Sequence, residues 1–499
     1  MSGFRREASE ILAELEALRG RDAPTHGGRV LSYVYDSGLA ELDELAAAAA
    51  RHVQPVNGLD PTTFTSVAAM ERGVVGFARE VFHGGDEVVG SVTSGGTESC
   101  ILAVKTARDA WRAAGGQGRA RLVAPVTAHA AFRKACHLLD VAYDTVPVDP
   151  ATGRPAPEAI ADRLAPDVAL VVVSAPSYPF ATLDPIAEVA ALAAARGVPV
   201  HVDACIGGFA LGFADASMPG GDLPAWDFAV PGVTSLSADL HKYGYAPKGV
   251  SVLLTRGRDR QRFQYFATTE WPGYPVVNPT LTGSKPAGPL AAAWAIIEAL
   301  GREGFASLTA RALRATAALR AAVDSIEGLQ VVGDPVGPLI AVRTDASVRA
   351  DRRVDPHHWA DAARAAGWHL QLQPALVQAD GTVLPRTTHL TVTPVTEGVL
   401  GELVQALIGA ADAVRGVAPV DGRDVLAGLG GLDLSGLLES GLDADGAAAL
   451  LGSFGLLGGG GALPERMAPV LALVEALPAP LTERLLIELL ARVVEPAAG

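Results

Sequence analysis

Two lysines lie in the segment SADLHKYGYAPKG, residues 237–249, which carries little other charge. A lysine amine becomes a nucleophile when burial and neighbouring cations lower its pKa and leave it uncharged. Lys242 directly follows His241 at the end of the apolar run VTSLSADL, whereas Lys248 lies further along the segment. The segment therefore predicts a reactive amine at a strand end, and Lys248 is either a second cation beside it or a solvated loop residue.

A glycine-containing segment, TSGGTES at residues 93–99, connects another short apolar run to an amphipathic helix. Glycine lets a ligand approach the backbone, and the start of a helix offers free N–H groups at the positive end of the helix dipole. Thr97 and Ser99 add hydroxyl groups. The segment is thus a candidate anion site, although it is equally typical of a tight turn with Ser and Thr caps.

His129 and Asp203 follow two more apolar runs, RLVAPVTA and VPVHV. Ligands of open α/β sheets bind beyond the carboxyl ends of the strands, so these residues are expected near one another. A lone histidine is more often structural than catalytic, but a carboxylate at a strand end is costly unless a cation or a protonated group pairs with it. Together with Lys242 and the anion site, they match a ligand with a phosphate, a flat ring, a protonated ring nitrogen and an aldehyde. That ligand is pyridoxal 5'-phosphate (PLP).

The predicted roles follow from the chemistry of PLP. Lys242 forms the Schiff base, and Asp203 keeps the ring nitrogen protonated so that the ring withdraws electrons. His129 lies over the face of the ring. The backbone of residues 96–97 holds the phosphate, helped by His241. These roles define a PLP-dependent enzyme.

The order of apolar runs predicts an α/β fold with a second, smaller domain. Between residues 56 and 310, apolar strands alternate with helices, which indicates βαβ units and a large domain with a mostly parallel sheet. Residues 311–415 predict a smaller α+β domain with an antiparallel sheet. Residues 1–55 form an N-terminal helical arm, and residues 416–499 form a C-terminal helical extension whose glycine run is expected to be a flexible joint.

The composition, 49% hydrophobic and 19% charged, describes a globular protein with a large core, and the net charge of −15 argues against a nucleic-acid partner. No apolar run is long enough to predict a membrane span, and the charged N-terminus is not typical of a signal peptide. Cys100, Cys136 and Cys205 have no metal-ligand spacing and are interpreted as buried residues of a reducing compartment. We therefore expect a cytoplasmic protein, and the scarcity of Lys beside Arg, Ala and Gly is typical of a GC-rich bacterial source.

The segments TSGGTES, HVDACIGGF and SADLHKYGYAPKG resemble the signatures of group II PLP-dependent decarboxylases, and the last is most similar to the sphingosine-1-phosphate lyase branch. Similar segments also occur in order at HAAFRKAC, SAPSYPFATLDPI and EWPGYPVVNPTLTGSK. The resemblance covers residues 30–310. It implies fold type I of the PLP enzymes, with a seven-stranded sheet, and a homodimer whose active sites lie at the subunit interface. It identifies Lys242 as the Schiff-base lysine and Lys248 as a second cation of the pocket.

The resemblance also implies a set of site residues. Those expected to bind the cofactor are Gly95, Gly96, Thr97, His129, Ser174, Asp203, His241, Lys242, Gly283 and Ser284. The last two would reach the cofactor phosphate of the partner subunit. The expected catalytic residues are Lys242, His129, Asp203, Lys248 and Tyr35, and the expected substrate-binding residues are Asn57, Asp60, Tyr35 and Lys248.

The substrate residues depart from the pattern of this branch. The segment NGLDPT keeps Asn57 of the usual Asn-Pro-Leu-His-Pro-Asp but places Asp60 where the histidine would be. A carboxylate repels a substrate phosphate at close range, so the substrate is not phosphorylated or carries an amine, unless Asp60 only begins a turn with Pro61. Lys285 stands in place of an Arg, which loses bidentate contact with phosphate or carboxylate, and Ala181 stands in place of a Gly.

The favoured function is a carbon–carbon lyase that splits a small amine, such as a phosphorylated amino alcohol or another β-hydroxy amine, into an aldehyde and an amine by retro-aldol chemistry. An amino-acid α-decarboxylase is the alternative, because it uses the same cofactor residues. A catalytically silent dimeric scaffold is a third interpretation, which the intact Lys242 and Asp203 disfavour. Aminotransferases share the fold but not these motifs.

Overall fold

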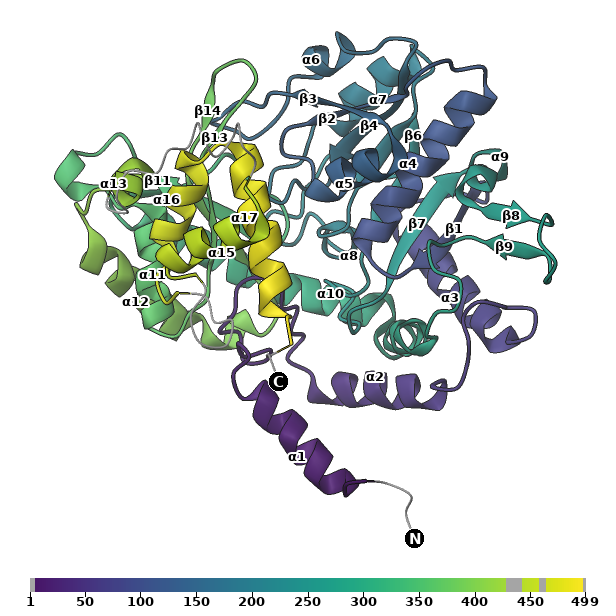
Figure 1. Cartoon of the computed structure of the whole chain (residues 1–499), viewed down its shortest axis with the longest axis horizontal. Coiled ribbons are helices and arrows are strands. Elements are labelled where there is room, and N and C mark those ends of the chain that lie inside the picture. The colour runs from purple at the N-terminus through teal and green to yellow at the C-terminus, as the bar shows by residue number, and fades with distance from the viewer. Residues whose placement is uncertain (1–4, 428–441, 457–463, 497–499) are drawn as a thin grey trace.

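A seven-stranded sheet lies at the centre of the larger part of the computed structural model, which describes residues 5–427, 442–456 and 464–496 (Figure 1). The spatial order is β1–β7–β6–β5–β4–β2–β3. The strands are β1 (Val88–Thr93), β2 (Arg121–Pro125), β3 (Ala142–Val146), β4 (Val168–Ser174), β5 (Val200–Asp203), β6 (Val233–Ala238) and β7 (Ser251–Arg256). Strand β7 runs antiparallel to β1 and β6, and the other pairs are parallel. The expected mostly parallel sheet is confirmed.

Helices pack on this sheet through their apolar sides. All seven residues of β4 are buried, as expected for a strand covered on both faces. The surrounding helices include α3 (Thr65–Val81), α4 (Gly96–Ala113), α5 (Ala130–Leu139), α6 (Pro157–Ala161), α7 (Ile186–Ala194), α8 (Gly208–Leu211) and α9 (Arg258–Gln261). The long helix α10 (Gly288–Asp324), which changes direction at Gly301, packs against α3 and against α2 (Ala40–His52).

A second, four-stranded sheet has the order β10–β11–β15–β12, with antiparallel neighbours throughout. Its strands are β10 (Leu329–Val331), β11 (Leu339–Thr344), β12 (Gln371–Gln373) and β15 (Thr387–Thr391). Helices α11 (Pro356–Ala365) and α12 (Thr396–Val414) pack together, and Trp359 and Trp368 are buried in their core. The expected small antiparallel sheet is confirmed.

Two short hairpins were not expected from the sequence. One pairs β8 (Phe266–Thr268) with β9 (Val276–Asn278), and the other pairs β13 (Leu376–Val377) with β14 (Val383–Leu384). Strand β3 was also not expected, because its mixed sequence AYDTV lacks a continuous apolar run. Strands of two or three residues, partly exposed, leave no clear hydrophobic alternation.

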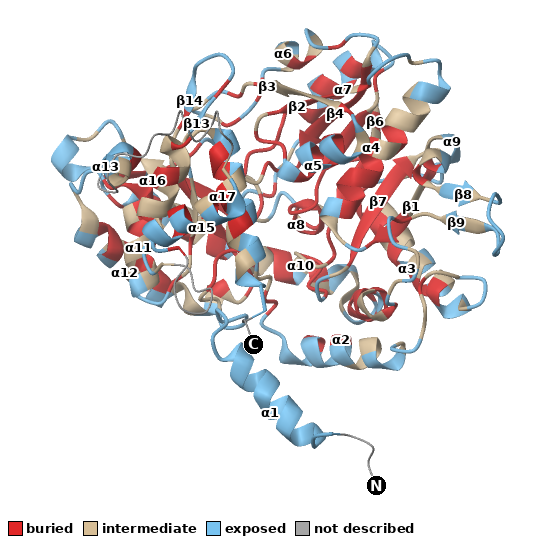
Figure 2. Ribbon diagram, viewed as in Figure 1, coloured by how far each residue is buried: buried red, intermediate tan, exposed pale blue. Residues whose placement is uncertain are grey.

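The N-terminal helix α1 (Ala8–Arg19) extends away from the rest of the molecule, and none of its residues is buried (Figures 1 and 2). Figure 2 shows that the buried residues concentrate in the strands and in the helix faces turned toward them. Across the three described ranges, we find no helix that is both long and apolar enough to cross a bilayer.

The C-terminal helices are α13 (Gly422–Ala427), α15 (Ala444–Ser453), α16 (Ala468–Ala476) and α17 (Ala479–Val493). Helix α16 packs against β12 and α11, α13 packs against α16, and α15 packs against α17. The predicted glycine joint, residues 458–461, lies outside the described residues. Asp361 of α11 accepts hydrogen bonds from the backbone N–H groups of Met467 and Ala468 at 2.8 and 2.9 Å, and thereby caps the start of α16. A carboxylate also favours the positive end of a helix dipole.

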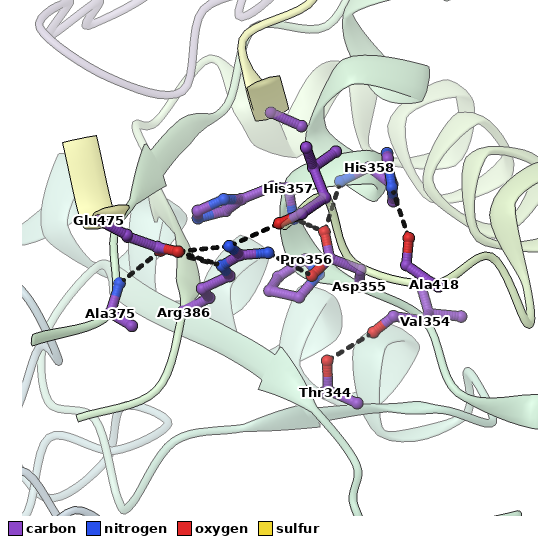
Figure 3. Close-up of polar contacts among 12 residues, drawn as sticks. Thr344, Val354, Asp355, Pro356, His357, His358, Ala375, Arg386, Ala418 and Glu475 are labelled. Carbon is purple, nitrogen blue, oxygen red and sulfur yellow. Dashed lines mark hydrogen bonds and ion pairs between the residues drawn. The ribbon is translucent and has the colours of Figure 1, made fainter. Parts of the chain in front are cut away.

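An ion pair between Arg386 and Glu475 also joins these helices to the smaller sheet. Arg386 Nε donates to both Glu475 oxygens at 2.9 and 2.8 Å, and Glu475 Oε1 accepts the Ala375 N–H at 2.8 Å. Figure 3 shows the guanidinium between Glu475 and Asp355, whose Oδ2 lies 3.8 Å from Nη1. Both side chains of the pair are mostly buried, so its loss leaves a charge in a poorly solvated place.

Replacing Glu475 with Ala should lower the free energy of unfolding by about 2–3 kcal/mol, because it leaves Arg386 and the Ala375 N–H without their main partner. Urea unfolding followed by circular dichroism measures the change. The control is Asp351→Ala, which removes an exposed partner of Arg349 and should leave the unfolding midpoint nearly unchanged. Equal effects of the two substitutions would contradict a stabilising role for the buried pair.

Candidate active site

The carboxyl ends of three neighbouring parallel strands form the base of the candidate site. Ser174 at the end of β4 is opposite Asp203 at the end of β5, and Asp203 is opposite Ser237 in β6. Asp203 is 7% exposed, and its Oδ1 accepts the N–H of Cys205 at 3.0 Å. This edge of the sheet therefore holds a buried carboxylate between two serines, as expected for residues that end parallel strands.

Lys242 lies in the turn after β6 and forms an ion pair with Asp239. Its Nζ is 2.9 Å from Asp239 Oδ2, and the Nε2 of His241 is 3.4 Å from the same oxygen. Burial, the largest single effect, lowers the pKa of the Lys242 amine, but the charge and hydrogen bond of Asp239, together with Tyr35 and Cys205, raise the pKa above its usual range. The expectation of a lowered pKa is wrong, because it took burial and nearby cations into account but not this carboxylate.

Asp239 is a site residue that the sequence analysis did not identify. It is 2% exposed, and its Oδ1 has no hydrogen-bond partner among the described residues. Burial, the largest single effect, raises its pKa, but the charge of Lys242, the charge and hydrogen bond of His241 and the hydroxyl of Ser251 together lower it below its usual range, so the carboxylate stays ionised. The signal in the sequence was a carboxylate at the end of an apolar run, three residues before the lysine.

The expected anion site lies at the start of α4. Gly95 is the N-cap of this helix, so no N-cap side chain covers the first N–H groups, and its φ of 152° is one that L side chains rarely adopt. A Cβ on Gly95 would lie 3.1 Å from His241 Cε1, and a Cβ on Gly96 would lie 2.7 Å from Asp239 Oδ2. The two glycines thus bring free N–H groups beside Lys242, and Thr97 is exposed next to them.

Ser99 does not take part in the anion site. It is fully buried and hydrogen bonds to Thr93 Oγ1 at 2.7 Å and to Ser251 Oγ at 3.0 Å. These bonds join α4 to β1 and β7. The expected contribution of this hydroxyl to anion binding is therefore wrong, and its role is structural.

His129 is the N-cap residue of α5. Its Nδ1 accepts the N–H of Ala131 at 3.1 Å, and the residue is exposed. The cap fixes which ring nitrogen faces the helix. Stacking of His129 on a cofactor ring stays a prediction.

Lys248 and Tyr35 lie beside Lys242 and belong with it to the first group of site residues. Lys248 Nζ lies 4.5 Å from the centre of the Tyr35 ring and donates to the backbone oxygen of His241 at 3.0 Å. Burial and, next, the charge of Lys242 lower the pKa of Lys248 to about 8. Burial raises the pKa of Tyr35 to about 12, so its hydroxyl stays protonated. Lys248 is exposed at the edge of this group, and of the two amines it is the one whose pKa is lowered.

Tyr178, which the sequence analysis did not single out, also borders this group. Its ring stacks on His389 of β15, with the ring centres 4.3 Å apart and an interplanar angle of 22°. Burial and then the neighbouring hydroxyls of Tyr35 and Tyr33 raise its pKa, while the charge of Lys242 acts in the opposite direction. Burial lowers the pKa of His389 to about 3, so the stacked imidazole is neutral. The residue was recognisable only as part of SAPSYPFATLDPI.

The remaining predicted residues, near Asn57 and Ser284, form a second group that is separate from the first. Asn57 Nδ2 donates to Ser284 Oγ at 3.1 Å, and Asn57 Oδ1 accepts the Lys285 N–H at 3.3 Å. Ser284, Lys285, Gly283 and Asp60 line a cavity of about 1130 Å³. Neither Lys242 nor any other member of the first group lines this cavity. Within the described chain, the predicted site residues are therefore divided between two places.

Asp60 has its oxygens engaged by the turn that it begins. Oδ1 accepts the N–H and the hydroxyl of Thr62 at 2.9 and 2.6 Å, and Oδ2 accepts the hydroxyl of Thr63 at 2.8 Å. These hydrogen bonds lower the pKa of Asp60 to about 2. Asp60 therefore begins a turn, and its carboxylate, which is charged at neutral pH, also borders the cavity. A contact between Asp60 and the substrate stays a prediction.

The groups at the sheet edge fit PLP. The uncovered N–H groups at the start of α4 suit its phosphate, the carboxylate of Asp203 suits a protonated ring nitrogen, and the amine of Lys242 suits its aldehyde. Gly96 leaves no room for a side chain between the helix and Asp239. The fit rests on the types of groups and on their common place at one sheet edge.

The fold and these groups define a PLP-dependent enzyme. The model of the pyridoxal-dependent decarboxylase conserved domain matches residues 56–345, more than half of the chain, so the chain belongs to this family. Within the family it is similar to sphingosine-1-phosphate lyases. It is 36% identical to that of Dictyostelium discoideum over 369 residues, which cover 73% of this chain and 66% of the relative. It is 34% identical to that of Arabidopsis thaliana over 411 residues, which cover 80% and 72%.

Solved structures agree with this assignment. The sphingosine-1-phosphate lyase of Burkholderia pseudomallei is 33% identical, with a TM-score of 0.75 over 83% of this chain and 92% of that chain. The glutamate decarboxylase of Lactobacillus brevis, at 19% identity and a TM-score of 0.72, shares the fold.

The C-terminal helices match a further model, the C-terminal putative HTH domain of pyridoxal-dependent enzymes, at residues 423–492. This segment has nine acidic and four basic residues. Binding to nucleic acid depends on cations that neutralise phosphates, so the charge of the segment is of the wrong sign. The contacts of Glu475 and the cap on α16 instead attach this segment to the smaller sheet.

Replacing Asp239 with Asn should lower the pKa of Lys242, because burial then acts on the amine without the opposing negative charge. The pH at which Lys242 reacts half-maximally with added PLP should fall by at least about one unit. The adduct is trapped with borohydride after removal of bound cofactor and counted by mass spectrometry. Asp227→Asn, which removes a buried carboxylate bonded to His83, is the control and should leave the midpoint in place. A midpoint that rises in the Asp239 variant would contradict the ion pair.

Proposed function

We propose that this protein is a PLP-dependent carbon–carbon lyase that cleaves a phosphorylated amino alcohol, of the sphingosine 1-phosphate type, into an aldehyde and a phosphorylated amine. The observation that carries the proposal is the position of Lys248 beside Lys242. A retro-aldol cleavage needs a base for the proton of the β-hydroxyl group, and the lowered pKa of Lys248, about 8, suits that role. When bound, PLP supplies the electron sink for the bond that breaks.

The other residues near Lys242 hold or transfer protons around the proposed base, Lys248. Lys248 Nζ lies over the ring of Tyr35, an arrangement that keeps the amine directed into the site. Tyr35 and Tyr178 have raised pKa values and serve as neutral hydroxyl donors to the substrate. Asp239 holds the positive charge of Lys242 when the amine is protonated. Asp203 would hold a proton on a ring nitrogen, and its burial with a single backbone N–H partner supports that role.

An amino-acid α-decarboxylase is the second candidate. The observation in its favour is the charged Asp60 at the cavity with Ser284 and Lys285, since a carboxylate there disfavours a substrate phosphate. Lys285 offsets this repulsion. We infer from the Lys248 group that cleavage of the carbon–carbon bond is the reaction, because release of carbon dioxide needs no base at a β-hydroxyl.

Purified protein with PLP should form an aldehyde from sphingosine 1-phosphate and should release no carbon dioxide from amino acids. Both products are measured in the same series, the aldehyde by derivatisation and the carbon dioxide from carboxyl-labelled substrates. Carbon dioxide without aldehyde would establish the decarboxylase instead.

The variant Lys248→Ala tests the role of Lys248 in the aldehyde assay, and Lys242→Ala is the variant with which it is compared. Lys248→Ala should keep the visible absorbance of bound cofactor and lose aldehyde formation by at least about a hundredfold, because the base is gone while Lys242 remains. Lys242→Ala should lose the absorbance as well. A Lys248→Ala protein with undiminished turnover would remove Lys248 from the mechanism.

We also propose that the active enzyme is a homodimer in which the second group completes the site of the partner subunit. Asn57, Ser284 and Lys285 form a polar group that does not border Lys242 of the same chain. Beside them, Trp271 and Tyr274 are 47% and 61% exposed, which is unusual for large aromatic side chains unless another surface covers them. A shared site also agrees with the family resemblance.

Mixing two inactive variants tests this arrangement. If the site is shared, an equal mixture of Lys242→Ala and Asn57→Ala subunits, unfolded and refolded together, should regain roughly a quarter of wild-type activity, since half of the dimers are hybrids and each hybrid has one intact site. If Asn57 serves its own subunit, no hybrid site is intact and the mixture stays inactive. Each variant refolded alone is the control.

Three free, buried cysteines support a reducing compartment. With the amino-acid bias noted above, they support our further proposal that this enzyme acts in a bacterial cytoplasm.

A further inference from the structure

Three side chains with metal-binding atoms meet below the sheet edge, although they are distant in sequence. The Sγ atoms of Cys100 and Cys205 and a carboxylate oxygen of Asp203 all lie within 4.8 Å of one another. Cys100 belongs to the second turn of α4, and Cys205 lies two residues after the end of β5. All three residues are buried, with exposed fractions of 1%, 8% and 7%.

Two carboxylates, Asp203 and Asp239, and one amine, Lys242, surround the thiols of this cluster, and the amine pairs with Asp239 rather than with Asp203. Asp203 forms no ion pair with any Lys, Arg or His of the described chain, and its Oδ1 has only the Cys205 N–H as partner. A Cβ on Gly96 would lie 2.8 Å from Cys205 Sγ and 2.7 Å from Asp239 Oδ2. Because both atoms lie next to the same point, the carboxylate of Asp239 is close to the thiol of Cys205. A buried carboxylate without a cation is costly, and a cation bound here offsets that cost.

We propose that Cys100, Cys205 and Asp203 form a binding site for a thiophilic divalent cation such as Zn²⁺ or Cd²⁺. Two thiolates and one carboxylate are a donor set that suits these ions, and three protein ligands leave a fourth position for water. Each thiol gives its proton to solvent when the metal binds.

A chain of buried hydrogen bonds also orients the thiol of Cys205. Ser237 Oγ lies 3.2 Å from Cys205 Sγ and 3.1 Å from His201 Nε2, and His201 Nδ1 bonds to Ser235 Oγ at 2.9 Å. These residues are buried. Outer hydrogen bonds of this kind fix the direction of a ligand atom and raise metal affinity.

The metal and the cofactor compete for one carboxylate. This part of the inference rests on the proposed role of Asp203 toward the ring nitrogen of PLP. A cation on Asp203 occupies the oxygen that would otherwise face that nitrogen, and two positive charges cannot share it at close range. The site therefore acts against cofactor loading: zinc slows the binding of PLP to the protein that lacks it.

Titration of the PLP-stripped full-length protein with Cd²⁺ tests the site, with the ultraviolet thiolate-to-cadmium absorption as the readout. We expect one Cd²⁺ per subunit. Cys100→Ala should weaken binding by more than about tenfold. Cys136→Ala, which removes a buried cysteine of α5 outside the cluster, should bind as the wild type does. Unchanged binding in Cys100→Ala, or loss of binding in Cys136→Ala, overturns the proposal.

Competition is measured separately from catalysis. Protein loaded with PLP should bind Cd²⁺ more than about tenfold more weakly than stripped protein, and Zn²⁺ should slow the return of cofactor absorbance when PLP is added. Cys100→Ser, checked by circular dichroism for a native fold, should load PLP at the same rate with and without Zn²⁺. Equal Cd²⁺ affinity of loaded and stripped protein overturns the competition. Neither readout depends on which substrate the enzyme cleaves.

Discussion

The ion pair between Lys242 and Asp239 determines how the rest of the site is built. A buried ammonium needs a buried carboxylate at contact distance, and the carboxylate in turn needs positive or polar neighbours. His241 supplies one such neighbour. Gly96 is required because any side chain there would collide with the carboxylate. The start of α4, the end of β6 and the lysine turn are thereby held in one arrangement by a single pair of charges.

Local signals in the sequence were sufficient for the buried central strands of the large sheet and for the principal lysine, but not for the edge strand β3. The apolar runs that end at Asp203 and before Lys242 fall on β5 and β6 because buried parallel strands need continuous hydrophobic residues. The hairpin β8–β9 was not predictable in this way, since its strands are short and exposed. The raised pKa of Lys242 was also beyond a reading of residue types, because it depends on which of several nearby charges lies at contact distance.

Long-range contacts explain the other differences. Ser99 lies in a segment typical of anion binding, but the fold turns its hydroxyl toward Thr93 and Ser251. Cys100 and Cys205 have no recognisable ligand spacing, yet α4 and β5 bring their thiols together. Asp60 shows the opposite case, in which a local turn, with Thr62 as hydrogen-bond donor, decides the conformation of a residue that family comparison placed at the substrate. The positions of Ser99 and of the two cysteines depend on packing between distant segments. The conformation of Asp60 depends on hydrogen bonds within its own turn.

The stack of Tyr178 on His389 joins a wall of the reaction chamber to the smaller sheet. A second link is the hydroxyl of Tyr243, next to Lys242, which donates to the backbone oxygens of Pro338 and Val392 at 3.1 and 2.8 Å. A rotation of one sheet relative to the other must therefore strain or break contacts that adjoin the reactive amine. The smaller sheet, which bears none of the lysines, thus helps to hold the two tyrosines that surround the reactive amine.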